Sequence, residues 1–148
     1  MTLSEQQPFV EAAAEIIGVR AEAVFAFQRK QVLDIGDIEG VHDQRVASRR
    51  LRAALEVFAP CLDRKRAKRA LHDVKVLAEA LGGRRDRDVQ LALLAQLHEQ
   101  CSGAEQRAVE VLVGELREEQ QRANVALAKA LARAKRTRLR RRLARLAR

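Results

Sequence analysis

The chain of 148 residues carries a net charge of +9, is 3% aromatic, and contains only two prolines and seven glycines. Few helix breakers together with abundant Ala, Leu, Arg, Glu and Gln favour an almost entirely helical protein with an aliphatic core, and they exclude a sheet-based fold. No apolar run approaches the ~20 residues that span a bilayer, and no signal-peptide pattern opens the chain, so these signs exclude membrane insertion and secretion.

Hydrophobic periodicity and helix breakers divide the chain into five to six helices. The expected helices cover about 8–35, 39–59, 62–81, 87–100 and 104–134, with a strongly basic terminal helix at about 136–148. Gly82 and Gly83 are expected to stop the third helix. Asp86 and Thr137 are expected to cap the fourth helix and the last. Short connectors between such helices predict an antiparallel bundle in a single domain, residues 1–148.

The expected second helix carries a row of cations on one side. At ~100° per residue, Arg45, Arg49 and Arg52 lie within about 80° of His42. The opposite side carries the apolar side chains that a core requires: Ala47, Leu51, Ala54, Leu55 and Phe58. This helix therefore displays a ladder of positive charge.

The expected third helix repeats this division. Its polar sector, about 80° wide, holds Lys65, Lys68, His72 and Lys75, while Leu71, Val74, Leu77, Ala78 and Leu81 occupy another sector. Two such helices joined by a tight turn would place charges about 4.5–6 Å apart along each axis, which suits a chain of phosphates. The alternative is a solvated face paired with acids, and Glu56 and Glu79 lie on the basic sides.

The terminal segment 131–148 contains nine Lys and Arg and no acid. Its leucines form a narrow stripe, which suits closure of the bundle, contact with a polyanion, or adsorption to an anionic membrane, and we rank the membrane last. Cys61 and Cys101 suggest unpaired, structural thiols in a reducing compartment, so we expect a cytoplasmic protein. No residue cluster predicts a metal or a cofactor.

Two ordered motifs resemble a known family. The first is Val41-His42-Asp43-x-Arg45-Val46-Ala47-x-Arg49-Arg50-Leu51-Arg52, and the second is Leu81-Gly82-x-x-Arg85-Asp86-x-Asp88-Val89. Together they resemble the CHAD domain, the conserved histidine α-helical domain. The resemblance implies an all-helical fold that binds inorganic polyphosphate through basic residues facing a central groove.

Carried over by position, the resemblance adds residues to the two ladders. His42 corresponds to the family's named histidine, and Arg50 joins its arginine signature. Arg85 and Asp86 match an Arg-Asp pair, in which we expect the aspartate to cap and orient. The predicted polyphosphate site therefore comprises His42, Arg45, Arg49, Arg50, Arg52, Lys65, Lys68, His72, Lys75 and Arg85.

The chain departs from the family in size, since members usually contain two related helical halves and only the first is present. A second copy could rebuild the missing surface through twofold symmetry, so we expect a homodimer. The resemblance also implies an association with polyphosphate granules.

Three functions compete. The leading hypothesis is non-catalytic binding of polyphosphate, and the alternative is a nucleic-acid-binding or architectural protein. Trp and Tyr are absent and the four Phe fit a core, so base-stacking platforms are lacking. We do not expect an enzyme, because no phosphate-cradling Gly-rich loop or nucleophile motif is present.

Overall fold

The computed structural model describes residues 7–146, and within that range the chain forms helices and no strands, which confirms the expected all-α bundle. The helices are α1 (Phe9–Phe25), α2 (Arg29–Val32), α3 (Ile38–Val57), α4 (Arg64–Gln100), α5 (Gly103–Arg136) and α6 (Leu139–Leu146), with a 3₁₀ turn at Ala59–Cys61.

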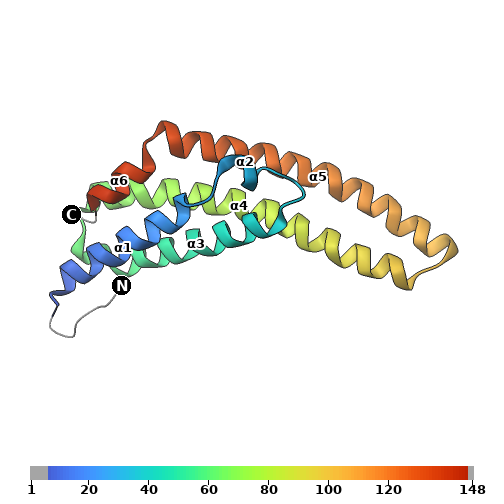
Figure 1. Ribbon diagram of the computed structural model, residues 1–148, viewed down its shortest axis with the longest axis horizontal. Coiled ribbons are helices and arrows are strands. Elements are labelled where there is room, and N and C mark those ends of the chain that lie inside the picture. The colour runs from blue at the N-terminus through green and yellow to red at the C-terminus, as the bar shows by residue number, and fades with distance from the viewer. Residues whose placement is uncertain (1–6, 147–148) are drawn as a thin grey trace.

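A bundle occupies one end of the molecule and a two-helix hairpin the other (Figure 1). In the bundle α3 packs between α1 and α4, and α6 folds back against α1, α4 and the end of α5. The later half of α4 and the earlier half of α5 extend beyond the shorter helices. Aliphatic side chains fill the bundle, including Ile17, Leu51, Leu55, Leu77, Leu81, Leu127, Leu139 and Leu143, all almost fully buried. Burial of the predicted stripe on α3 is thereby confirmed.

The expected first helix is interrupted. The region predicted as one helix from 8 to 35 consists of α1 and the short α2, separated by an extended Gln28. Tertiary contacts explain the break: Val32 is fully buried, and the carbonyl of Leu33 accepts a hydrogen bond from Asn124 of α5 at 2.9 Å. A continuous helix would carry both groups past these partners.

The two expected helices on either side of Gly82 and Gly83 are one helix. Residues 64–100 form the uninterrupted α4, so the prediction of a stop at the glycines was wrong. Leu81 and Arg84, which flank the pair, are both buried at the bundle centre, and this burial outweighs the low helix propensity of glycine. Asp86 therefore lies exposed within the helix and caps nothing.

The chain leaves α5 by a tight turn and enters α6. Arg138 has a left-handed backbone with φ of 52°, and the Thr137 hydroxyl donates back to the Ala134 carbonyl at 3.4 Å. Thr137 thus ends α5, and the prediction that it caps a terminal helix was wrong. Leu139 and Leu143 are fully buried, so α6 closes the bundle. Residues 147–148 of the predicted terminal helix lie outside the described residues.

Candidate functional site

A local cap fixes the start of α3. The Asp37 carboxylate accepts a hydrogen bond from the Gly40 backbone N–H at 2.9 Å, which satisfies one of the free donors of the first turn. A Cβ on Gly40 would lie only 3.0 Å from that carboxylate, so glycine allows the close approach. The cap sets where the helix begins, and hence which residues face α4.

Two neighbouring arginines of α4 hold this start in place. Arg84 donates to the Ile35 carbonyl and Arg85 to the Ile38 carbonyl, each at 3.2 Å. Both contacts tie the α2–α3 connection and the first turn of α3 to the middle of α4. They therefore fix the register in which the cations of the two helices meet.

Arg84 is the centre of a buried polar network that the sequence analysis missed. It is fully buried and donates to Asp88 at 2.9 Å and to Asn124 at 2.7 Å, while Gln120 donates to Asp88 at 2.6 Å. The second motif had predicted roles for Arg85 and Asp86 instead. A signal existed, because residues 77, 81, 84 and 88 recur at core spacing on an unbroken helix.

Cations from both helices meet along the α3–α4 seam, which we define by Arg45, Arg52, Lys75 and Arg85. Arg45 crosses onto α4 at Gly82, where its Nε lies 3.8 Å from the position that a Cβ would take. Further along, Glu56 contacts Arg52 at 3.0 Å and Lys75 at 3.4 Å.

Glu56 therefore neutralises part of the seam. The pKa of Glu56 is lowered mainly by the hydrogen bond from Arg52 and less by Lys75. Together these two cations outweigh the effect of burial, which raises the pKa. The carboxylate stays ionised at neutral pH and holds two cations of the seam side by side. The pairing of acids with the basic sides, which we left open from the sequence, is thus present at this glutamate.

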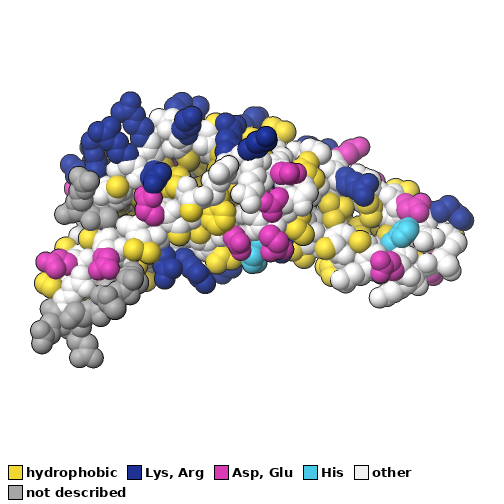
Figure 2. All heavy atoms as spheres, viewed as in Figure 1, with side chains coloured by type: hydrophobic (Ala, Val, Ile, Leu, Met, Phe, Trp, Pro, Cys, Tyr) yellow, Lys and Arg dark blue, Asp and Glu magenta, His cyan; other side chains and the backbone are white. Residues whose placement is uncertain are grey.

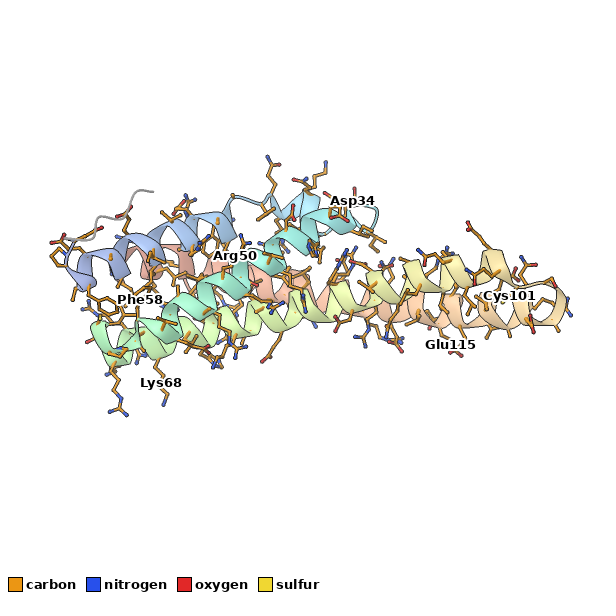
Figure 3. The ribbon with its side chains drawn as sticks, turned by 90° about the horizontal axis from the view of Figure 1, so that it is seen from below. Asp34, Arg50, Phe58, Lys68, Cys101 and Glu115 are labelled. Atoms are coloured by element: carbon orange, nitrogen blue, oxygen red, sulfur yellow. The ribbon has the colours of Figure 1, made fainter. Side chains whose placement is uncertain are left out.

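The structure separates other residues of the predicted site from the seam. Arg50 projects from α3 about 160° away from Arg52, toward the α1 side (Figure 3). Lys65 is exposed near the start of α4, and Lys68 projects outward from that helix. His72 is also exposed and, with Lys68, borders a hollow toward α5 and α6. His42 is half-buried and Arg49 exposed, both on the outer side of α3.

A second charged cluster joins three helices. Asp73 of α4 is only 7% exposed and accepts from Arg133 of α5 at 3.0 Å and from Arg142 of α6 at 2.6 Å. Burial opposes ionisation of Asp73, but the two arginine hydrogen bonds outweigh it and lower the pKa of the carboxyl. Sequence spacing gave no signal for this cluster, because its members lie far apart in the chain.

Other titratable groups make contacts between helices. His98 lies 3.0 Å from Glu110 across the α4–α5 hairpin, and Arg140 of α6 pairs with Glu22 of α1. Over residues 7–146, no group of three or more His, Cys, Asp or Glu is placed to hold a metal ion. No helix in the same range is long and apolar enough to cross a membrane.

Comparisons with known proteins identify the family. A family model described as the CHAD domain matches residues 19–148, nearly the whole chain. No curated protein and no solved structure matches. The match includes both motifs and all helices from the middle of α1 onward.

Proposed function

The chain belongs to the CHAD domain family, and on this premise we propose that it binds inorganic polyphosphate through the cations of α3 and α4. The family is associated with polyphosphate binding. The observation that carries the proposal is the α3–α4 seam, where Arg45 and Arg52 of one helix meet Lys75 and Arg85 of the next.

The chemistry of the seam suits a linear polyanion. Arginine offers two parallel N–H donors to a phosphate, and lysine supplies a compact charge. A row along two packed helices matches repeated charges better than a single compact anion. Arg49 and His42 on the outer side of α3, and Lys65, Lys68 and His72 on α4, lie outside the seam and supply further charge to a chain long enough to pass beyond it. Binding by such a row releases counterions, so affinity falls steeply with salt.

Charge reversal of the α3 row tests this function. We expect Arg45→Glu/Arg49→Glu to abolish measurable binding of long-chain polyphosphate in a calorimetric titration, because two attractions become repulsions. The matched control is Arg107→Glu/Arg117→Glu, which makes the same charge change on exposed residues of the α4–α5 hairpin. Circular dichroism verifies that both variants keep their helices. Equal affinity in the two variants contradicts the proposal.

We propose that binding is non-catalytic and takes place in the cytoplasm, with an association with polyphosphate granules. The carboxylate of Glu56, which lies among the cations of the seam, is paired with Arg52 and Lys75. The residues of the seam therefore form no arrangement that activates water or a nucleophile. Release of orthophosphate from polyphosphate by the wild-type protein, absent from the Arg45→Glu/Arg49→Glu variant, would overturn the non-catalytic assignment.

We also propose that two copies associate through the α4–α5 hairpin. Val89, Leu93 and Leu97 recur every four residues on α4 and are 42%, 59% and 43% exposed. This row continues the side of α4 against which α3 packs nearer the bundle end. A helix from a second copy would cover it as α3 covers the earlier part, and exposed apolar rows of this kind mark interaction sites.

The oligomeric state tests the association. We expect the wild-type chain of 16.6 kDa to sediment as a dimer, and Leu93→Glu to sediment as a monomer, because the change places a charge in the row. Val125→Glu places the same charge on an exposed valine of α5, outside the row on α4, and should remain dimeric. A monomeric wild type at every concentration contradicts this proposal and leaves polyphosphate binding untouched.

A further inference from the structure

A second concentration of positive charge lies where α6 returns to the start of α4. Lys and Arg side chains gather over α6 and the adjoining end of α5 (Figure 2). Where α6 meets the start of α4, a pocket of about 480 Å³ is lined, among the described residues, by arginine alone: Arg66, Arg69, Arg142 and Arg145. We call it the arginine pocket.

Among the described residues, little of the charge of the arginine pocket is compensated. Asp73 pairs with Arg142. In the described part of the chain, Arg66, Arg69 and Arg145 make no ion pair within 4.0 Å, and no carboxylate lines the pocket. Four guanidinium groups around one hollow repel each other, and a bound anion removes that repulsion. Guanidinium forks match the oxygens of a phosphate group.

Buried residues beneath the arginine pocket fix the position of α6 and of Arg142. Leu139 and Leu143 are fully buried and anchor α6, which carries Arg142 and Arg145 to the start of α4. Asp73, almost buried itself, orients Arg142 through a 2.6 Å hydrogen bond. Arg142 is therefore positioned before any anion arrives, which lowers the ordering cost of its contact with a ligand.

The arginine pocket is continuous with the outer side of α4. An adjoining hollow of about 550 Å³ shares Arg69 and Arg142 with it and extends past Asp73, whose carboxylate is paired with Arg133 and Arg142, to Lys68 and His72. Those two residues belong to the ladder predicted on α4. A path of cations thus runs around α4 from the ladder to α6.

We infer that the arginine pocket binds phosphate groups, either those of a short oligophosphate or those at the end of a long chain that crosses Lys68 and His72. The second source rests on the proposed function, since it requires polyphosphate on α4. The pocket itself is a separate site, because none of its four arginines belongs to the α3–α4 seam.

Titration with two ligands tests the inference. Tripolyphosphate is short enough to fit in the pocket, and long-chain polyphosphate can follow the whole path. We expect Arg66→Gln/Arg145→Gln to lower tripolyphosphate affinity at least about tenfold, because each lost charge-assisted contact is worth about that factor. Both side chains are exposed and make no ion pair with residues 7–146, so the fold should be retained. Arg107→Gln/Arg117→Gln is the control of equal charge and should bind like wild type.

The ladder variant separates the two proposals. We expect Arg45→Glu/Arg49→Glu to lose long-chain polyphosphate while it keeps at least a third of the wild-type tripolyphosphate affinity, roughly within RT of the original free energy. If Arg66→Gln/Arg145→Gln binds tripolyphosphate as the control does, the arginine pocket is not a phosphate site. In that case the proposed function still stands if the ladder variant alone loses the long chain, and falls if it does not.

Discussion

The α3–α4 seam and the arginine pocket are both basic, but the protein treats their charge differently. At the seam Glu56 accepts from one cation of each helix, so part of the positive charge is neutralised by an ion pair that joins α3 to α4. In the arginine pocket, Arg142 alone has such a partner within the part of the chain that the structure describes, the almost buried Asp73. The charge that a helical face displays in projection is therefore not the charge that it offers to a ligand.

The two surfaces also depend on different supports. The seam is held by Arg84 and Arg85, which tie the start of α3 to α4 through backbone carbonyls. The arginine pocket depends on α6, a helix of eight residues anchored by buried leucines and by Asp73. Each support can be removed separately, which allows the comparison to be tested.

The largest expected effect comes from removing the support of the seam. Arg84→Met should lower the free energy of unfolding by about 3–5 kcal/mol, because Asp88 is left as a buried charge without its arginine. Chemical denaturation measures the change. Adding Asp88→Leu should recover a large part of the loss, since the unpaired charge is then gone.

The neighbouring arginine provides the matched control. Arg85 donates to a backbone carbonyl and pairs with no carboxylate in the described range, so Arg85→Met should cost only about 1 kcal/mol. An equal loss in the two single variants would contradict the central place of Arg84 in the core.

A smaller effect is expected at the support of the arginine pocket. Asp73→Asn should lower stability by about 1–3 kcal/mol at neutral pH, because the negative charge is lost and an amide NH2 replaces one of the two oxygens that accept from Arg133 and Arg142. The pKa of Asp73 is lowered in the folded state, so its contribution is complete above its ordinary value of 3.8 and is lost as pH falls through the lowered value. Denaturation midpoints of wild type and variant should therefore converge below about pH 4. A constant difference down to pH 2 would contradict the linkage.

The smallest effect on stability is expected at the seam itself. Glu56→Gln should change stability by less than about 1 kcal/mol, since its ion pairs are exposed. Polyphosphate affinity should rise several-fold, because Arg52 and Lys75 are released to the ligand. Glu79→Gln removes the same charge on α4 from an exposed residue with no ion pair among the described residues. An equal rise in both variants would assign the effect to net charge alone.

Local periodicity was sufficient to predict much of the fold. The apolar stripe of α3 is buried as its spacing required, and the leucines of the terminal segment do close the bundle. The predicted helix ends were wrong where tertiary packing, and not the position of glycine or proline, determines where a helix ends. Gly82 and Gly83 lie within a helix whose neighbouring residues are buried, whereas the break after α1 occurs without a glycine or proline at the break.

The candidate site could be predicted only along single helices. Spacing placed Arg45 and Arg52 on one side of α3; Arg45 does reach α4 at Gly82, whereas Arg52 is linked to Lys75 of α4 through Glu56. The same spacing puts Arg50 on another side, so the family signature and the helical projection disagree there. The arginine pocket was beyond prediction, because it joins residues about 75 positions apart through the turn at Arg138.

The central claim, that the cations of α3 and α4 form a polyphosphate site rather than a generally basic surface, is tested most directly by competition. Labelled long-chain polyphosphate is bound to the wild-type protein, and DNA is added to an equal concentration of phosphate. The account predicts that DNA displaces little of the label, and that Arg45→Glu/Arg49→Glu never binds it. Complete displacement by DNA, or full binding by the variant, would contradict the account.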